Sequence, residues 1–146
     1  EKFIPMTIQR VRDQQKVLIH ANEEKTQAGS RHYIHAQDVA DGLMFILNLK
    51  NYTHKGDFGN AKCPKFNLVG PVEIDNLTLA QTIAKVQKKD LIYELIDNHT
   101  SRPGHDLRYS LSPKLLKSLG WEPKIKLSKR IEEVVEWSLK NKRWLS

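Results

Sequence analysis

The 146-residue sequence has little of what disulfide-rich, membrane-spanning or metal-binding proteins need. Cysteine occurs once, at Cys63, so an internal disulfide is excluded and no thiolate cluster is left for a structural metal. The longest apolar run, Leu43 to Leu47, is much too short to cross a bilayer. Of the histidines, His32 and His35 lie three apart on an expected extended segment and point to opposite faces, so we expect no metal site.

An export signal is also missing. No charged, apolar, small-residue leader opens the chain, so we expect a cytoplasmic protein with no membrane partner. Glu1 stands where a complete chain has Met, which fits a piece of a longer protein. The mean hydropathy of -0.56 is typical of a globular chain. The length fits one domain over residues 1–146 with a modest core.

Basic residues exceed acidic ones, which gives a formal net charge of +7. Such a balance suits nucleic acid, because bound phosphates release counterions. However, Lys and Arg are spread along the chain, with only short clusters at 124–130 and 140–143. We therefore expect no nucleic-acid partner, and a positive field also suits a smaller polyanion such as a diphosphate.

Apolar periodicity predicts a mixed α/β order of elements. Helices are expected over Lys2–Asp13, from Gln37 or Asp38 through Leu47, from Asn76 or Thr78 to Lys88, from Ser112-Pro113 to Gly120, and over Ser128–Asn141. Extended segments are expected over Val17–His20, His32–His35, Lys65–Val69 and Leu91–Ile96, with a surface loop over Asn51–Pro64. The second helix should bury Val39, Leu43, Ile46 and Leu47, and the three tryptophans, Trp121, Trp137 and Trp144, are assigned to packing.

The segment Arg102–Tyr109 places two guanidiniums and one imidazole around a Pro-Gly turn. Arginine pairs bidentately with phosphate, and a Pro-Gly turn lets a ligand approach the backbone closely. The composition favours a polyanionic ligand. A solvated surface turn is the alternative that this segment alone leaves open.

Six segments, in this order, carry a resemblance to one family: Glu1–Pro5, Ser30–Ala40, Phe66–Gly70, Arg102–Tyr109, Leu119–Pro123 and Val135–Trp137. Together they resemble the C-terminal portion of the NAD-dependent sugar-nucleotide 4,6-dehydratases, within the extended short-chain dehydrogenase/reductase superfamily. The resemblance implies a small, mixed α/β C-terminal domain that lacks the N-terminal dinucleotide-binding Rossmann part. It also implies a nucleotide-diphosphate sugar as ligand, the missing Rossmann half as partner, and a homodimer of the parent enzyme.

Two motifs that this family needs do not occur in the sequence. The Gly56 to Gly59 cluster does not open an apolar helix, so it is not a dinucleotide fingerprint. The tyrosines, Tyr33, Tyr52, Tyr93 and Tyr109, are followed four residues later by Gln37, Gly56, Asp97 and Pro113, never by Lys. The resemblance therefore implies a substrate-binding part without catalytic residues, inactive alone, while the missing half binds NAD and performs hydride transfer and dehydration.

The resemblance assigns six residues to the sugar nucleotide. Arg31 and Arg102 would clamp the diphosphate, Asn67 would lie near the phosphates or ribose, His105 by the diphosphate or sugar, Lys2 at the phosphate end, and His20 against the nucleoside. Two departures leave the base open among dTDP, UDP and GDP sugars: Ala21–Lys25 replaces the usual Gly-x-Gly turn, and His32 replaces a frequent Asp. An epimerase or decarboxylase of the same superfamily, and a stand-alone nucleotide-sugar-binding module, are the alternatives.

Overall fold

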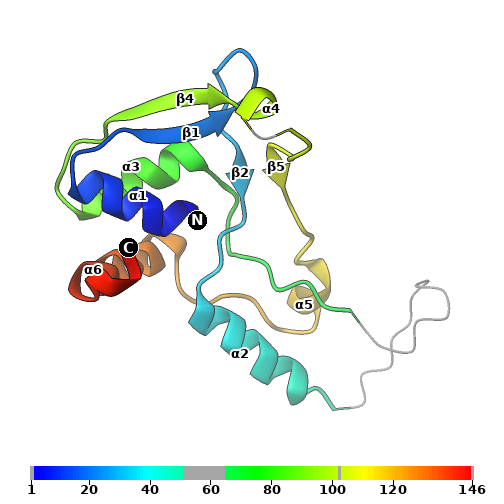
Figure 1. Cartoon of the computed structure of the whole chain (residues 1–146). Helices are drawn as coiled ribbons and strands as arrows, with labels where there is room; N and C mark the ends of the chain where they lie inside the picture. Colours follow the sequence, from blue (N-terminus) through cyan, green and yellow to red (C-terminus); the bar gives the residue numbers. More distant parts are fainter. Residues whose placement is uncertain (1, 51–64, 102, 146) are drawn as a thin grey trace.

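The computed structural model describes residues 2–50, 65–101 and 103–145 of the chain. Three helices, α1 (Phe3–Arg12), α3 (Asn76–Val86) and α6 (Leu127–Lys140), pack together beside the strands β1 (Val17–Ala21) and β4 (Tyr93–Asp97) (Figure 1). The remaining elements are β2 (Ser30–Arg31), α2 (Ala36–Leu47), β3 (Ile74–Asp75), α4 (Asn98–Ser101), β5 (Arg108–Tyr109), α5 (Lys114–Ser118) and the 3₁₀ turn η1 (Lys142–Leu145).

Strand pairing divides the described strands between two small sheets. β1 pairs β4 in parallel, with His20 opposite Ile96 and Ala21 opposite Asp97. The second sheet has the order β3-β2-β5, in which β2 runs antiparallel to β3 and parallel to β5. As a result, the carboxyl end of β1, the short β2 and the turn before β5 converge beside the start of α1 (Figure 1).

The core consists of two clusters on the faces of α3. One joins Ile8, Leu79, Ile83, Leu127, Ile131, Val135 and Leu145. The other joins Val11, Val17, Ile19, Ala28, Ala80 and Ala84. Helical spacing on α1, α3 and α6 and alternation along β1 bring these side chains inward, which confirms the periodicity that predicted these four elements.

Helix α2 is held by polar contacts rather than by its apolar residues. Asp38 is buried and accepts from Arg130 of α6 at both carboxylate oxygens, at 2.6 and 3.1 Å. Asp41 accepts from the indole Nε1 of Trp121 at 2.9 Å, and a Cβ on Gly42 would lie 2.8 Å from the same ring. The buried face of α2 therefore carries Asp38 and Gly42, one turn apart.

The buried face of α2 differs from the face that the sequence predicted. Leu43 and Leu47 are 51% and 78% exposed, whereas Val39 and Ile46 are half-buried. The ion pair to α6 and the close approach of Trp121 at Gly42 fix the rotation of the helix, and they turn Leu43 and Leu47 outward. The tryptophans divide in the same way: Trp121 is buried as expected, but Trp137 and Trp144 are 52% and 58% exposed.

One expected strand is wrong, and a second expected extended segment pairs elsewhere. Lys65–Val69 forms no strand, because no described residue pairs with it in a ladder. The ladder pairs expected at His32–His35 form instead at Ser30–Arg31, directly before that segment. The expected cap of α3 shifts as well, since Asp75 accepts from the Thr78 backbone N–H at 2.8 Å. The expected loop over Asn51–Pro64 lies outside the described residues.

Helix α5 starts and ends near the expected positions. Its N-cap is Pro113, and Ser112 Oγ accepts only a long bond of 3.4 Å from the Lys114 N–H. Gly120 follows the helix with a φ of 99°, the left-handed conformation that favours glycine and ends helices. No helix among the described residues is long and apolar enough to span a membrane.

Replacing Asp38 with alanine should destabilise the fold by about 2 kcal/mol, because Arg130 would lose its buried partner and keep only its contacts with Gln37 and Glu133. Urea unfolding followed by tryptophan fluorescence measures the change. Glu122→Ala is the matched control: Glu122 pairs with Lys117 on the exposed surface, and its loss should cost less than about 1 kcal/mol. An equal effect of the two variants would show that the α2–α6 ion pair does not hold α2.

Candidate functional site

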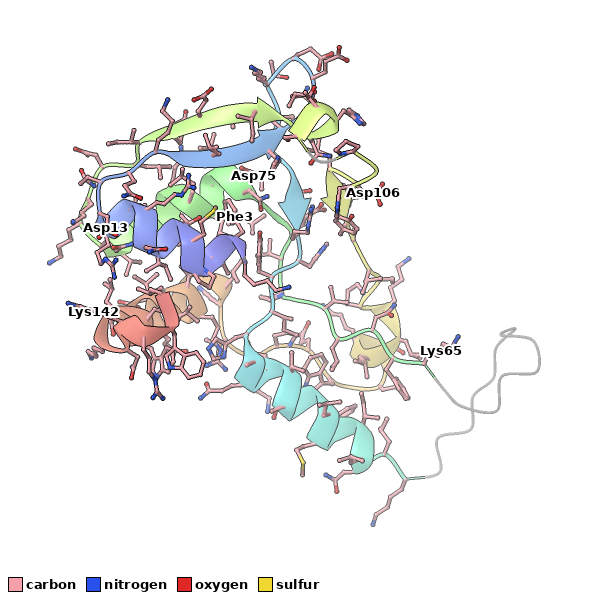
Figure 2. All side chains as sticks on the ribbon, in the orientation of Figure 1. Phe3, Asp13, Lys65, Asp75, Asp106 and Lys142 are labelled. Carbon is pink, nitrogen blue, oxygen red and sulfur yellow. The ribbon has the colours of Figure 1, made fainter. Side chains whose placement is uncertain are left out.

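A cavity of about 420 Å³ opens where α1, β1, β2 and the turn before β5 converge. Phe3 and Asp106, both labelled in Figure 2, lie on the α1 side and the turn side of this cavity. Its lining, which we call the α1–β1 cavity, comprises Lys2, Phe3, Met6, Arg10, Leu18, His20, Gly29, Arg31, Tyr33, Asn76, Ile96, Asn98, His105, Asp106 and Leu107. The cavity therefore draws on segments from residue 2 to residue 107.

Four of the six expected site residues line this one cavity: Lys2, His20, Arg31 and His105. Lys2 is the N-cap residue of α1, His20 lies on the outer face of β1, and Arg31 ends β2. His105 lies in the turn between α4 and β5. Residues up to 103 positions apart in the sequence thus meet at one place.

The other two expected residues are not part of this group. Asn67 lines a separate cavity of about 110 Å³ beside Trp121, and its side-chain amide donates to the Ser112 carbonyl at 3.3 Å. The expected place of Asn67 near the phosphates or ribose therefore stays a prediction, without support from the α1–β1 cavity. Arg102 lies outside the described residues.

Arg31 is held by backbone carbonyls. Its Nη1 donates to the carbonyl oxygens of Ser30 and Leu107, at 2.6 and 2.8 Å, and Tyr109 lies under the guanidinium at 4.2 Å. A guanidinium carries five N–H groups, and these two contacts use the two on Nη1. Three N–H groups, on Nε and Nη2, are left. The edge formed by Nε and Nη2 makes only one long contact among the described residues, 3.5 Å to the Asp106 carbonyl. This edge is the one that can pair bidentately with an anion.

The cavity wall is fixed by partly buried hydrogen bonds. Tyr33 donates to the Asn76 side-chain oxygen at 2.7 Å, and burial raises the pKa of the Tyr33 hydroxyl to about 12. Asn98 donates to the His105 carbonyl at 2.7 Å, which holds the turn that carries His105. Gly29 allows the close approach of β2 to this turn, because a Cβ there would lie 2.7 Å from the Leu107 carbonyl oxygen.

His20 is oriented by the short helix α4. Its Nδ1 lies 2.9 Å from the Ser101 hydroxyl. Asp97 caps α4 by accepting from the backbone N–H groups of His99 and Thr100, at 3.0 and 2.9 Å. The hydroxyl and backbone N–H of Thr100 are the main reason that the pKa of Asp97 lies below its ordinary range. Asp97 therefore occupies the N-terminus of α4, and His20 is positioned from its last residue.

Outside this cavity, Glu73 ties β2 to β5. It accepts from the Ser30 hydroxyl at 2.7 Å and from Nε and Nη2 of Arg108 at 2.6 and 2.8 Å. Arg108 hence pairs with a carboxylate and does not line the cavity. The pairing with Arg108, followed by the Ser30 bond, lowers the pKa of Glu73 to about 2.

Arg10, Asn76 and Asn98 also line the cavity, and the sequence reasoning missed them. Arg10 was detectable in principle, because Lys2, Met6 and Arg10 recur every four residues on the helix face opposite Ile8 and Val11. Asn76 and Asn98 depend on tertiary contacts with Tyr33 and the 105–107 turn. Within the described ranges, no group of three or more metal-ligating side chains gathers anywhere.

Comparison with known proteins relates this architecture to enzymes that act on sugar nucleotides. No family model matches the chain. A dTDP-glucose 4,6-dehydratase from Streptomyces niveus is 28% identical over 145 residues, which cover 99% of the chain and 38% of that protein. The dTDP-glucose 4,6-dehydratase from Bacillus anthracis, solved with NAD, superposes with a TM-score of 0.73 at 24% identity over 99% of the chain and 42% of that structure.

A UDP-glucuronic acid 4-epimerase from Bacillus cereus, solved with UDP-glucuronic acid and NAD, also gives a TM-score of 0.73, at 15% identity over 97% of the chain and 40% of that structure. The fold is that of the C-terminal part of an extended short-chain dehydrogenase/reductase. The sequence relatives of the chain include dTDP-glucose 4,6-dehydratases. The chain spans about 38% of the length of those relatives.

The Glu73 contacts predict a loss of stability in acid. Its pKa of about 2 lies below the ordinary value of 4.5, so the folded state binds fewer protons than the unfolded state. Its contribution is present above pH 4.5 and disappears as the pH falls from 4.5 towards 2. Urea unfolding at several pH values should show this slope, and Glu73→Gln should flatten it. An unchanged slope in Glu73→Gln would rule out this carboxylate as its source.

Proposed function

We propose that this chain binds the diphosphate of a nucleotide sugar in the α1–β1 cavity, as the substrate-binding part of a 4,6-dehydratase. The observation that carries the proposal is the convergence of Lys2, Arg31 and His105 on one cavity, from three separate segments. Each of these side chains can donate hydrogen bonds to phosphate oxygens. His20 lies on the same cavity, on the β1 wall.

Preorganisation supports the role of Arg31. Its Nη1 is fixed by two carbonyls and its plane by Tyr109, so little side-chain entropy is left to lose on binding. The start of α1 adds to the positive field, because its first turn has no acidic residue and no side chain caps it. A diphosphate at this end of the cavity would therefore contact a fixed cation and a helix N-terminus together.

The described residues do not fit NAD. A dinucleotide site places pyrophosphate at the N-terminus of a helix that directly follows a strand. Two described helices directly follow a strand, α3 after β3 and α4 after β4, and a carboxylate occupies the start of each. Asp75 accepts from the Thr78 N–H at the start of α3, and Asp97 accepts from two N–H groups at the start of α4.

The proposal thus limits this chain to holding and orienting the sugar nucleotide. Hydride transfer and dehydration belong to residues outside it. We further propose that the dinucleotide-binding half of the longer protein packs on the exposed apolar face of α2, formed by Leu43, Met44 and Leu47. The homodimer expected for the parent enzyme stays a prediction.

An epimerase is the second candidate, because solved 4-epimerases share the fold at the same TM-score. The sequence relatives favour the dehydratase. Mass spectrometry of the product formed by the longer protein distinguishes the two reactions, since a dehydratase removes one water from the sugar and an epimerase leaves its mass unchanged.

Arg31→Gln should weaken binding of UDP by about tenfold or more, because a charge-assisted pair to phosphate contributes about 1.5–3 kcal/mol. Binding of uridine, which has no phosphate, should change much less. An NMR titration of the chain measures both affinities. Arg108→Ala is the control, since Arg108 pairs with Glu73 outside the cavity. Equal losses for UDP and uridine would show that Arg31 only supports the cavity wall.

Calorimetry with NAD should give no saturable heat, because both strand-to-helix junctions carry aspartate caps. UDP, measured on the same sample, is the positive control. Saturable NAD binding in the micromolar range would contradict the proposal that this chain holds the sugar nucleotide and does not bind NAD.

A further inference from the structure

Arg10 lies at the far end of the α1–β1 cavity. Lys2, Met6 and Arg10 line it from one face of α1, at intervals of four residues. The eight residues from Lys2 to Arg10 correspond to about 12 Å along the helix axis. Figure 1 shows the start of α1 beside β2, and Figure 2 labels Asp13 at the opposite end of the helix. A ligand that touches both ends must therefore be extended.

The chemistry of the lining changes along this axis. Lys2, Arg31 and His105 gather at the β2 end. The lining also contains apolar side chains, Met6 of α1, Leu18 of β1 and Ile96 of β4. Because His20 pairs with Ile96 in the β1–β4 register, Leu18 and Ile96 lie on the same face of that sheet. An apolar wall of this kind suits the face of a planar ring.

Arg10 ends this apolar stretch with fixed hydrogen-bond donors. Its Nη1 donates to the Lys16 carbonyl at 2.7 Å, which anchors the guanidinium at the turn between α1 and β1. No other hydrogen bond or ion pair of Arg10 occurs within the described ranges, so its other N–H groups can serve a ligand. A guanidinium has donors and no acceptor, and it therefore selects ligands that present an oxygen or a ring nitrogen acceptor there.

We propose that Arg10 donates a hydrogen bond to a keto oxygen of the nucleotide base, an inference that rests on the proposed function. The base lies against Met6, Leu18 and Ile96, and the phosphates lie at the Arg31 end. Uracil, thymine and guanine carry an acceptor oxygen where cytosine and adenine carry an amino donor. Arg10 therefore favours keto bases, because an amino group at the same ring position offers it no acceptor.

UDP and CDP provide the sharpest test, because at the ring position that carries O4 in uracil, cytosine carries an amino group. An NMR titration of the isotope-labelled chain with each nucleotide and with pyrophosphate measures the three affinities. The unaltered chain should prefer UDP over CDP by about tenfold, the ratio that 1.4 kcal/mol gives. In Arg10→Gln this preference should fall below about twofold, while the affinity for pyrophosphate stays unchanged.

Arg12→Gln is the matched control, because Arg12 lies on the same helix, pairs with Asp13 and does not line the cavity. It should keep the full preference for UDP. If the spectrum of Arg10→Gln shows loss of the fold, Arg10→Lys decides: it keeps one cation without the planar fork, and its preference should fall severalfold.

The outcomes separate this inference from the proposed function. Saturable binding of UDP and CDP with equal affinity overturns the role of Arg10 and leaves the diphosphate site standing. A loss of pyrophosphate affinity in Arg10→Gln equal to the loss for UDP also overturns it, because Arg10 would then contact phosphate. If neither UDP nor pyrophosphate saturates the unaltered chain, the proposed function fails first.

Discussion

The guanidinium of Arg31 joins the parts of the chain that form the cavity. Its bonds to the carbonyls of Ser30 and Leu107 tie the end of β2 to the turn that carries His105. β2 and β5 each contain two residues, so their ladder is short and needs support from side chains. Arg31 supplies that support on the cavity side, and Glu73 supplies it on the outer side through Ser30 and Arg108. The same arginine thus supports the wall and lines the cavity.

Close backbone approach is the second constraint on this region. A Cβ at Gly70 would overlap the carbonyl of Tyr33, and one at Gly29 would crowd the carbonyl of Leu107. These glycines let three separate segments meet without side chains between them. Tyr33 can then reach Asn76 and bring the start of α3 to the cavity. The geometry of the site therefore depends as much on missing side chains as on charged ones.

The sequence predicted elements well where burial follows a simple period. α1, α3 and α6 each present an apolar face to the same core, so the spacing of Ile8, Ile83 and Ile131 sufficed. It failed for α2, since a buried Asp38 paired with Arg130 and a Gly42 against Trp121 set its orientation. Hydrophobicity alone contains no information about that pair. The strand expected at Lys65–Val69 failed because a strand requires a hydrogen-bonding neighbour, which local sequence does not reveal.

The candidate site shows the same division. Lys2, His20, Arg31 and His105 were chosen through the resemblance, and the fold brings them to one cavity. Local spacing could not have joined Lys2 to His105, because their proximity follows from the parallel β1–β4 pairing and the β2–β5 contact. Asn67 was chosen on the same grounds and lies elsewhere. The roles of all five residues in binding a sugar nucleotide stay predictions.

The helices of this structure begin in two ways, with or without an aspartate that caps their first N–H groups. α3 and α4 begin with aspartate side chains that bind their own N–H groups, so their positive ends are neutralised from within. α1 begins with Lys2 and has neither an acidic first turn nor a side-chain cap. α5 and α6 also begin without an acidic first turn or a side-chain cap, but of these three helices α1 is the one that lines the cavity, so its dipole adds to the cations there. Since α1 also lines the cavity along its length, the site is polarised, with its positive end at β2 and its apolar stretch towards Arg10.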